Sequence, residues 1–198
     1  MDQLVADRDR FLAIVRRWHA GHERVDQVEH CENVANLLNR ALDLEPGPVA
    51  ARREMILAAL GHDLYEDSEI PPSDVIAFGA DVDQLIRVVT EEKDGVGPYV
   101  ERVAVGPEEA RLIKLCDGAD NYGGLVEKNL VSAEPAKWVR VVRKHMEPMF
   151  SRLVNIPFAR YPVAGAWLSQ LLAEKRERFW AVVEGMLSDS ELSSGTRQ

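Results

Sequence analysis

Six consecutive residues, His62 to Asp67, carry the side chains best suited to chemistry in this chain. They read HDLYED and follow directly on the apolar run MILAAL at 55–60, so one imidazole and three carboxylates lie close together. Carboxylates crowded behind a buried segment repel one another and are costly to desolvate unless a cation or a proton offsets their charge. A divalent metal ion is the economical explanation. A solvated acidic helix end is the alternative, because clustered charges usually lie on the surface.

Two further polar residues stand beside apolar segments. His30 lies next to the apolar side of a predicted helix from about 26 to 44, where a lone histidine is more often a core residue than a ligand. Asp117 comes directly after the stretch ARLIKLC at 110–116. An aspartate at the end of a buried stretch needs a partner, and a metal ion could be that partner.

Composition limits the classes of function. The chain has 198 residues, of which 46% are hydrophobic and 29% charged, as is usual for one soluble globular domain. Its net charge of −9 argues against unaided binding to long nucleic acid or to anionic lipid. Small phosphorylated substrates stay possible, because a metal ion can supply positive charge locally.

The location predicted from the sequence is cytoplasmic. Cys31 and Cys116 are too few for a disulfide framework and lack CxxC spacing, as expected in a reducing compartment. The first twenty residues do not resemble a signal peptide. No apolar run approaches the roughly 18 residues of a membrane span, so we expect no membrane contact.

Hydrophobic spacing predicts helices throughout and no strands, which makes the fold class all-α. Helices are expected at about 4–20, 26–44, 49–64, 75–78, 81–91, from 108 onward, and twice between 135 and 187. A punctuated loop is expected at 93–107, with room for a short ordered piece at about 99–105. We expect a single domain over residues 1–188. The Ser- and Asp-rich tail at 189–198 should fray.

The order of His30, the His62-Asp63 pair and Asp117 resembles the H…HD…D order of the HD-domain superfamily of metal-dependent phosphohydrolases. Further motifs narrow the resemblance to the SpoT-like (p)ppGpp pyrophosphohydrolases, including their small single-domain members. HDLYED at 62–67 is similar to HDxxED, HCENVA at 30–35 to HPxxVA, FGADV at 78–82 with VT at 89–90 to FGxxV…VT, KLCD at 114–117 with Asn121 to KLADxxxN, and HAGHER at 19–24 to HxGQxR. These motifs cover about residues 17–125 in the right order.

The resemblance implies a fold and a role for each matching residue. The fold would be an HD-domain helical bundle with additional C-terminal helices. One divalent metal, expected to be Mn²⁺ with Fe²⁺, Zn²⁺, Co²⁺ or Mg²⁺ as alternatives, would be held by His30, His62, Asp63 and Asp117. Glu66 and Asp67 would orient and deprotonate the attacking water at the 3′-linked phosphate, and Arg24, Lys114 and Asn121 would contact a phosphorylated nucleotide.

Departures from the family pattern bear on specificity more than on the metal site. Cys31 replaces the usual proline, Gly118 stands where Arg or Lys is usual, and Asp120 where Tyr or His is common. Lost positive charge should weaken binding of a highly phosphorylated nucleotide. Another HD-type nucleotidase or nucleoside-triphosphate hydrolase is therefore an alternative. A catalytically silent HD module that binds a nucleotide or a protein is a second one, and the C-terminal helices could complete the core or form a homodimer face.

Overall fold

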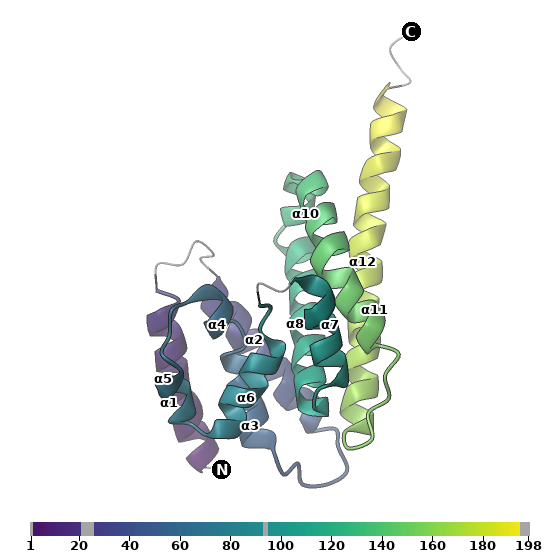
Figure 1. The fold of residues 1–198 in the computed structure, drawn as a ribbon. Coiled ribbons are helices and arrows are strands. Elements are labelled where there is room, and N and C mark those ends of the chain that lie inside the picture. Colours follow the sequence, from purple (N-terminus) through teal and green to yellow (C-terminus); the bar gives the residue numbers. More distant parts are fainter. Residues whose placement is uncertain (1, 21–25, 93–94, 195–198) are drawn as a thin grey trace.

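The structure, a computed structural model, describes residues 2–20, 26–92 and 95–194, with side chains up to residue 186. Every regular element in these ranges is a helix, so the all-α prediction is confirmed (Figure 1). The elements are α1 (Asp2–Trp18), α2 (Gln27–Leu42), α3 (Arg52–Leu60), α4 (Leu64–Asp67), α5 (Pro72–Ile76), α6 (Ala80–Val89), α7 (Val96–Val105), α8 (Glu108–Glu127), α9 (Leu130–Ala133), α10 (Pro135–Val141), the π-helical turn η1 (Val142–Met146), α11 (Glu147–Leu153) and α12 (Pro162–Ser194).

Helix α8 is the centre of the bundle. It contacts α2, α3, α6, α7, α9, α11 and α12. Its residues from Glu109 to Ala119 are all buried, which is the pattern of a helix enclosed on every side. Polar side chains on α8, such as Asp117, are therefore forced to find partners inside the protein.

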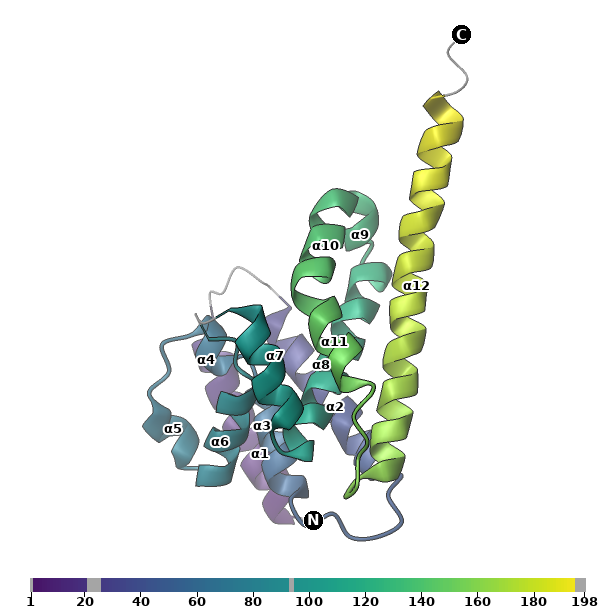
Figure 2. The same cartoon turned by 45° about the vertical axis from the view of Figure 1, so that its right-hand side comes forward.

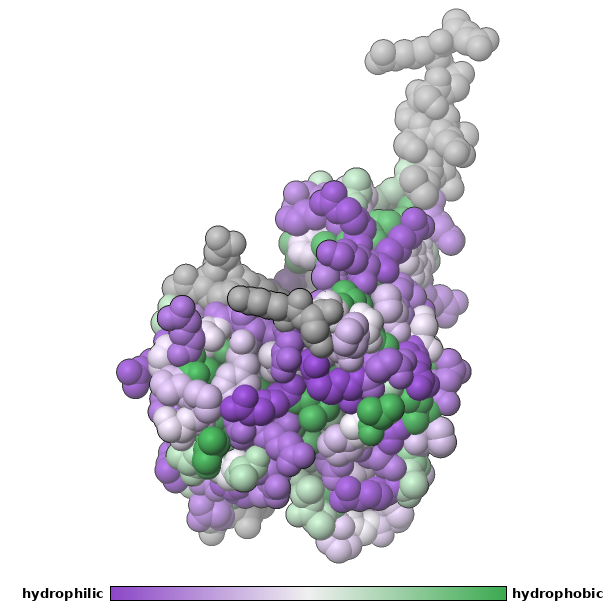
Figure 3. All heavy atoms as spheres, viewed as in Figure 1, coloured by the Kyte–Doolittle hydropathy of each residue, from purple (hydrophilic) through white to green (hydrophobic). Residues whose placement is uncertain are grey.

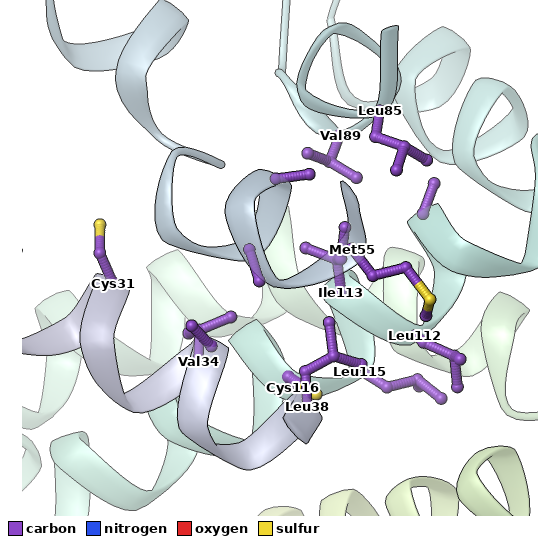
Figure 4. Packing of buried hydrophobic residues seen from close by; sticks show 14 of the residues in the cluster. Cys31, Val34, Leu38, Met55, Leu85, Val89, Leu112, Ile113, Leu115 and Cys116 are labelled. Carbon is purple, nitrogen blue, oxygen red and sulfur yellow. The ribbon is translucent and has the colours of Figure 1, made fainter. Parts of the chain in front are cut away.

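The core joins segments that are distant in sequence. Figure 4 shows Val34 and Leu38 of α2 and Met55 of α3 beside side chains of α8, with Leu85 and Val89 of α6 in the same cluster. Helix α12 runs along α8 and extends beyond the other helices in both views of the ribbon (Figures 1 and 2). It continues to Ser194, into the segment expected to fray.

The helix predicted at 49–64 is interrupted, and this part of the prediction was wrong. Helix α3 ends at Leu60, and His62 and Asp63 lie in the turn before α4. Gly61 makes the turn possible because a Cβ atom there would meet the Phe11 ring at 2.8 Å and Ile86 Cδ1 at 2.9 Å. The turn therefore packs tightly against the core, and His62 within it is completely buried.

The segment predicted as a loop at 93–107 contains a full helix, α7, from Val96 to Val105. Gly97 and Pro98 made this helix hard to recognise in the sequence. Both fall in its first turn, where proline is tolerated because the first amide groups have no partner within the helix.

A further departure is the π turn η1, which precedes Pro148 in α11. A proline cannot donate to the preceding turn and displaces the carbonyl there, which accounts for the widened helix.

Gly118 allows α11 to approach α8. A Cβ atom at this position would overlap the ring of Phe150. The small residue that replaces the family's usual Arg or Lys therefore serves packing, since Phe150 occupies the space that a longer side chain would need.

The carboxylate of Glu147 links α11 to α8 and α12 through hydrogen bonds and an ion pair. Its Oε1 accepts hydrogen bonds from Tyr122 Oη at 2.6 Å and Trp180 Nε1 at 3.1 Å, and Arg176 pairs with the same carboxylate. Burial alone would raise the pKa of Glu147, but the guanidinium and these hydrogen bonds hold it below its usual value.

The surface in Figure 3 is mostly hydrophilic, with small hydrophobic patches scattered over it. Within residues 2–20, 26–92 and 95–194, no helix has the length and apolar character needed to cross a membrane.

Candidate metal centre and active site

Three elements bring the four predicted ligands together. His30 comes from α2, His62 and Asp63 from the turn between α3 and α4, and Asp117 from the middle of α8. His30 Nε2 lies 3.2 Å from His62 Nε2, 3.2 Å from Asp117 Oδ1 and 3.6 Å from Asp63 Oδ2. His62 Nε2 lies 3.1 Å from Asp63 Oδ1 and 3.7 Å from Asp117 Oδ1. Ligand atoms of four residues thus face one small volume.

The orientation of His62 is fixed from behind. The residue is completely buried, and its Nδ1 lies 2.8 Å from the carbonyl oxygen of Ala59. A carbonyl can only accept, so Nδ1 carries the proton and the other nitrogen, Nε2, faces the cluster. This arrangement is typical of metal-binding histidines.

Lys114 balances the charge of Asp117. Burial alone would raise the pKa of Asp117, but the charge of Lys114 and hydrogen bonds from both imidazoles hold it well below its usual range. Burial also disfavours the charged form of Lys114, yet Asp117 keeps the pKa of the ammonium group well above its usual value. Asp117 therefore remains a carboxylate inside the protein.

The donor set suits a divalent cation. Ligand atoms of His30, His62 and Asp117 lie within 4.8 Å of one another, as do those of a second group formed by Cys31, His62 and Asp63. Two imidazoles with two carboxylates form a mixed nitrogen and oxygen set that suits Mn²⁺, Fe²⁺ or Zn²⁺. Burial raises the pKa of the Cys31 thiol, which keeps it protonated and makes it the weaker donor. The cluster could therefore hold one divalent metal.

Two side chains outside the predicted set support the ligands. Asp120 Oδ2 lies 2.7 Å from His30 Nδ1, and Gln27 Nε2 donates to Asp63 Oδ2 at 2.5 Å. Sequence reasoning noted Asp120 only as a departure and missed Gln27. Their spacing was an available signal, because each lies three residues, or about one helical turn, from a predicted ligand on the same helix.

A cavity of about 310 Å³ opens onto the cluster. Its wall includes His30, Asp63 and Asp117 together with Glu66 and Asp67, and Tyr99, Met146, Met149 and Phe150 contribute less polar surface. The two carboxylates predicted to handle water therefore share one cavity with three of the predicted ligands.

Glu66 stands at the rim of this cavity. The residue is exposed, and its Oε1 accepts a hydrogen bond from the backbone amide of Glu91. Desolvation by surrounding protein raises the pKa of Glu66 to about 7, against the opposing charge of Lys114. A carboxylate in the cavity that also holds the predicted ligands is placed to accept a proton from water.

The predicted nucleotide contacts are only partly within the described structure. Lys114 and Asn121 line the cavity, and both donate to Asp117, with Asn121 Nδ2 at 2.5 Å from Asp117 Oδ1. Arg24 lies outside the described residues. Asn121 and Met146 also line a neighbouring cavity of about 1130 Å³ between α2, α8, α10 and α12, so the two cavities adjoin.

Comparison with known proteins finds a likeness in structure. No protein-family model matches the chain, and no curated protein matches it significantly. A solved structure described as a metazoan ortholog of SpoT, which hydrolyzes ppGpp and plays a role in starvation responses, superimposes with a TM-score of 0.62. The two sequences are 23% identical, and the match covers 87% of this chain and 96% of the other. The likeness establishes the HD-domain fold expected from the sequence.

Proposed function

We propose that this protein is a metal-dependent phosphohydrolase that removes the 3′-pyrophosphate of (p)ppGpp or of a closely related nucleotide. The observation that carries the proposal is the convergence of His30, His62, Asp63 and Asp117 on one cavity that also contains Glu66 and Asp67. Buried imidazoles and carboxylates beside an open, acid-lined cavity form an arrangement suited to hydrolysis rather than to structural metal binding alone.

The reaction requires a nucleophile, a base and a means to neutralise phosphate charge. A divalent cation held by the four ligands would supply positive charge and acidify water. Glu66, assisted by Asp67, orients a water molecule and accepts its proton. The water oxygen forms a bond to the 3′-linked phosphorus, the bond from that phosphorus to the ribose 3′ oxygen breaks, and the 3′ oxygen takes up a proton as pyrophosphate leaves.

Substrate identity rests on two kinds of support. The motifs at 30–35, 62–67, 78–90 and 114–121 resemble those of (p)ppGpp hydrolases, and the structurally similar protein is described as hydrolysing ppGpp. Mn²⁺ is the metal that this resemblance implies.

A second candidate function follows from the charge of the cavity. Among the described residues that line the 310 Å³ cavity, Lys114 is the only lysine or arginine, and it is already paired with Asp117. A substrate with fewer phosphate groups needs less positive charge. This observation favours a nucleoside-monophosphate or nucleoside-triphosphate hydrolase as the alternative.

A hydrolysis panel separates these functions. Metal-free protein loaded with Mn²⁺ should release pyrophosphate and GDP from ppGpp faster than it releases phosphate from nucleoside mono- or triphosphates. The reverse preference would establish the alternative. Protein that binds no transition metal and hydrolyses no member of the panel would contradict both and would indicate a silent HD module.

A further inference from the structure

Gln27 is a buried polar residue of the cavity, and its contact with Asp63 uses only one half of its amide group. It is the first residue of α2, only 1% exposed, and it lines the 310 Å³ cavity with His30 and Asp63. A polar side chain this deeply buried needs hydrogen-bond partners for both of its amide groups.

The contact with Asp63 decides which way the amide points. A carboxylate can only accept hydrogen bonds, so the group 2.5 Å from Asp63 Oδ2 must be the NH₂ group of Gln27. The amide oxygen, Oε1, is then fixed on the other side of the same planar group. It is buried and has no hydrogen-bond partner among the described residues.

The chemistry of an unpartnered oxygen limits what can fill the gap. Oε1 accepts hydrogen bonds and cannot donate, so its partner must bring a proton. Ionised phosphate oxygens accept only and do not qualify. No N–H or O–H group of the described residues donates to Oε1. Within a hydrolase cavity, a water molecule or a hydroxyl of the substrate sugar can supply the missing O–H group.

We propose that Gln27 is a positioning residue of this site: its amide nitrogen holds Asp63, and its amide oxygen accepts a hydrogen bond from an O–H group in the cavity. The first half concerns metal binding and stands on this chain's own contacts. The second half rests on the proposed function, because it concerns the water or nucleotide that reacts there. A glutamine that orients water in this manner is known in other phosphoryl-transfer sites.

Gln27→Met tests the proposal because methionine has a similar length and volume but forms neither hydrogen bond. Gln170→Met is the matched control, since Gln170 is an exposed residue of α12 whose side chain donates a hydrogen bond to Glu174. Calorimetric titration with Mn²⁺ in the absence of nucleotide should show about tenfold weaker binding for Gln27→Met and unchanged binding for the control. The circular dichroism spectrum of metal-free Gln27→Met should match that of wild type, which establishes that the variant is folded.

Kinetics with ppGpp and its 2′-deoxy analogue distinguish the two O–H sources. If Oε1 holds water, Gln27→Met lowers kcat by a similar factor for both nucleotides. If Oε1 holds the 2′-hydroxyl, the variant raises KM for ppGpp, and its effect disappears with the analogue.

Unchanged Mn²⁺ affinity and unchanged kinetics would overturn the proposal. So would an equal loss of Mn²⁺ affinity in Gln27→Met and in the control Gln170→Met, since that pattern indicates that the contact with Asp63 has no part in metal binding. Failure of wild type to hydrolyse ppGpp would refute the proposed function instead, and the Mn²⁺ titration would still decide whether Gln27 supports the metal site.

Discussion

Replacing Asp120 with alanine is expected to weaken Mn²⁺ binding by about tenfold, or about 1.4 kcal/mol. Asp120 Oδ2 lies 2.7 Å from His30 Nδ1, on the side of the ring opposite the cluster. A carboxylate in this position orients the imidazole and makes its other nitrogen a better donor. Such contacts contribute about 10- to 100-fold to metal affinity. The lower end applies here because the Asp120 side chain is 25% exposed, so solvent weakens its interaction with the ring.

Two variants at this position separate charge from geometry. Asp120→Asn keeps an oxygen that can accept a hydrogen bond from His30 Nδ1 but removes the negative charge. Its affinity for Mn²⁺ should therefore lie between that of wild type and that of Asp120→Ala. Calorimetric titration of metal-free protein with Mn²⁺ measures both. Asp9→Ala is the control, because Asp9 is an exposed aspartate on α1.

The reasoning would be refuted if Asp120→Ala bound Mn²⁺ as tightly as wild type, or if Asp9→Ala lost as much affinity. Melting temperatures of the metal-free variants provide a check on folding, since a partly unfolded protein would also bind metal weakly.

Four other substitutions probe the site and the fold. His62→Ala should lose the metal, because it removes a buried imidazole from the cluster, and metal analysis by mass spectrometry of the purified protein should find almost none. Glu66→Ala should keep the metal and lose about 10²- to 10⁴-fold in turnover, so activity equal to that of wild type would contradict its role as base. Gly118→Ala should lower the free energy of unfolding by about 1–3 kcal/mol, because the added methyl group overlaps an aromatic ring of α11. The control is Gly124→Ala on the same helix, where the added methyl group meets open space, so this variant should be neutral or stabilised by up to about 1 kcal/mol. Denaturant titrations measure both variants, and equal changes in their free energies of unfolding would argue against a clash at Gly118. Glu147→Gln should lower the melting temperature at neutral pH. The folded-state pKa of Glu147 is depressed, so its contribution to stability is present above the usual pKa of 4.5 and is lost as the pH falls through the lower folded-state pKa. The difference in melting temperature between Glu147→Gln and wild type should therefore shrink in acid, and a constant difference would refute this account.

Local patterns in the sequence were sufficient for the helical fold class and for the choice of candidate ligands. Hydrophobic spacing is a property of neighbouring residues, so it identified most helices without knowledge of their packing. The same holds for His62 and Asp63, which stand beside an apolar run whose burial could be foreseen. Helix α7 was anticipated only as a short ordered piece at 99–105, because glycine and proline dominate its first turn, where they are tolerated.

Element boundaries at the site depended on contacts that the sequence does not display. The interruption of the helix at Gly61 follows from the closeness of Phe11 and Ile86, which lie on other helices. Gly118 looked like a lost basic residue, but its size is explained by Phe150 on α11.

The sequence by itself determined which side chains could bind a metal and in what order they occur, because ligand chemistry belongs to residue types. Only the tertiary structure decided how those side chains are held. Gln27 meets Asp63 across 36 positions, and Asp120 meets His30 across 90. Hydrogen bonds between residues so far apart depend on how α2, α8 and the turn before α4 pack together, and no local periodicity encodes that packing.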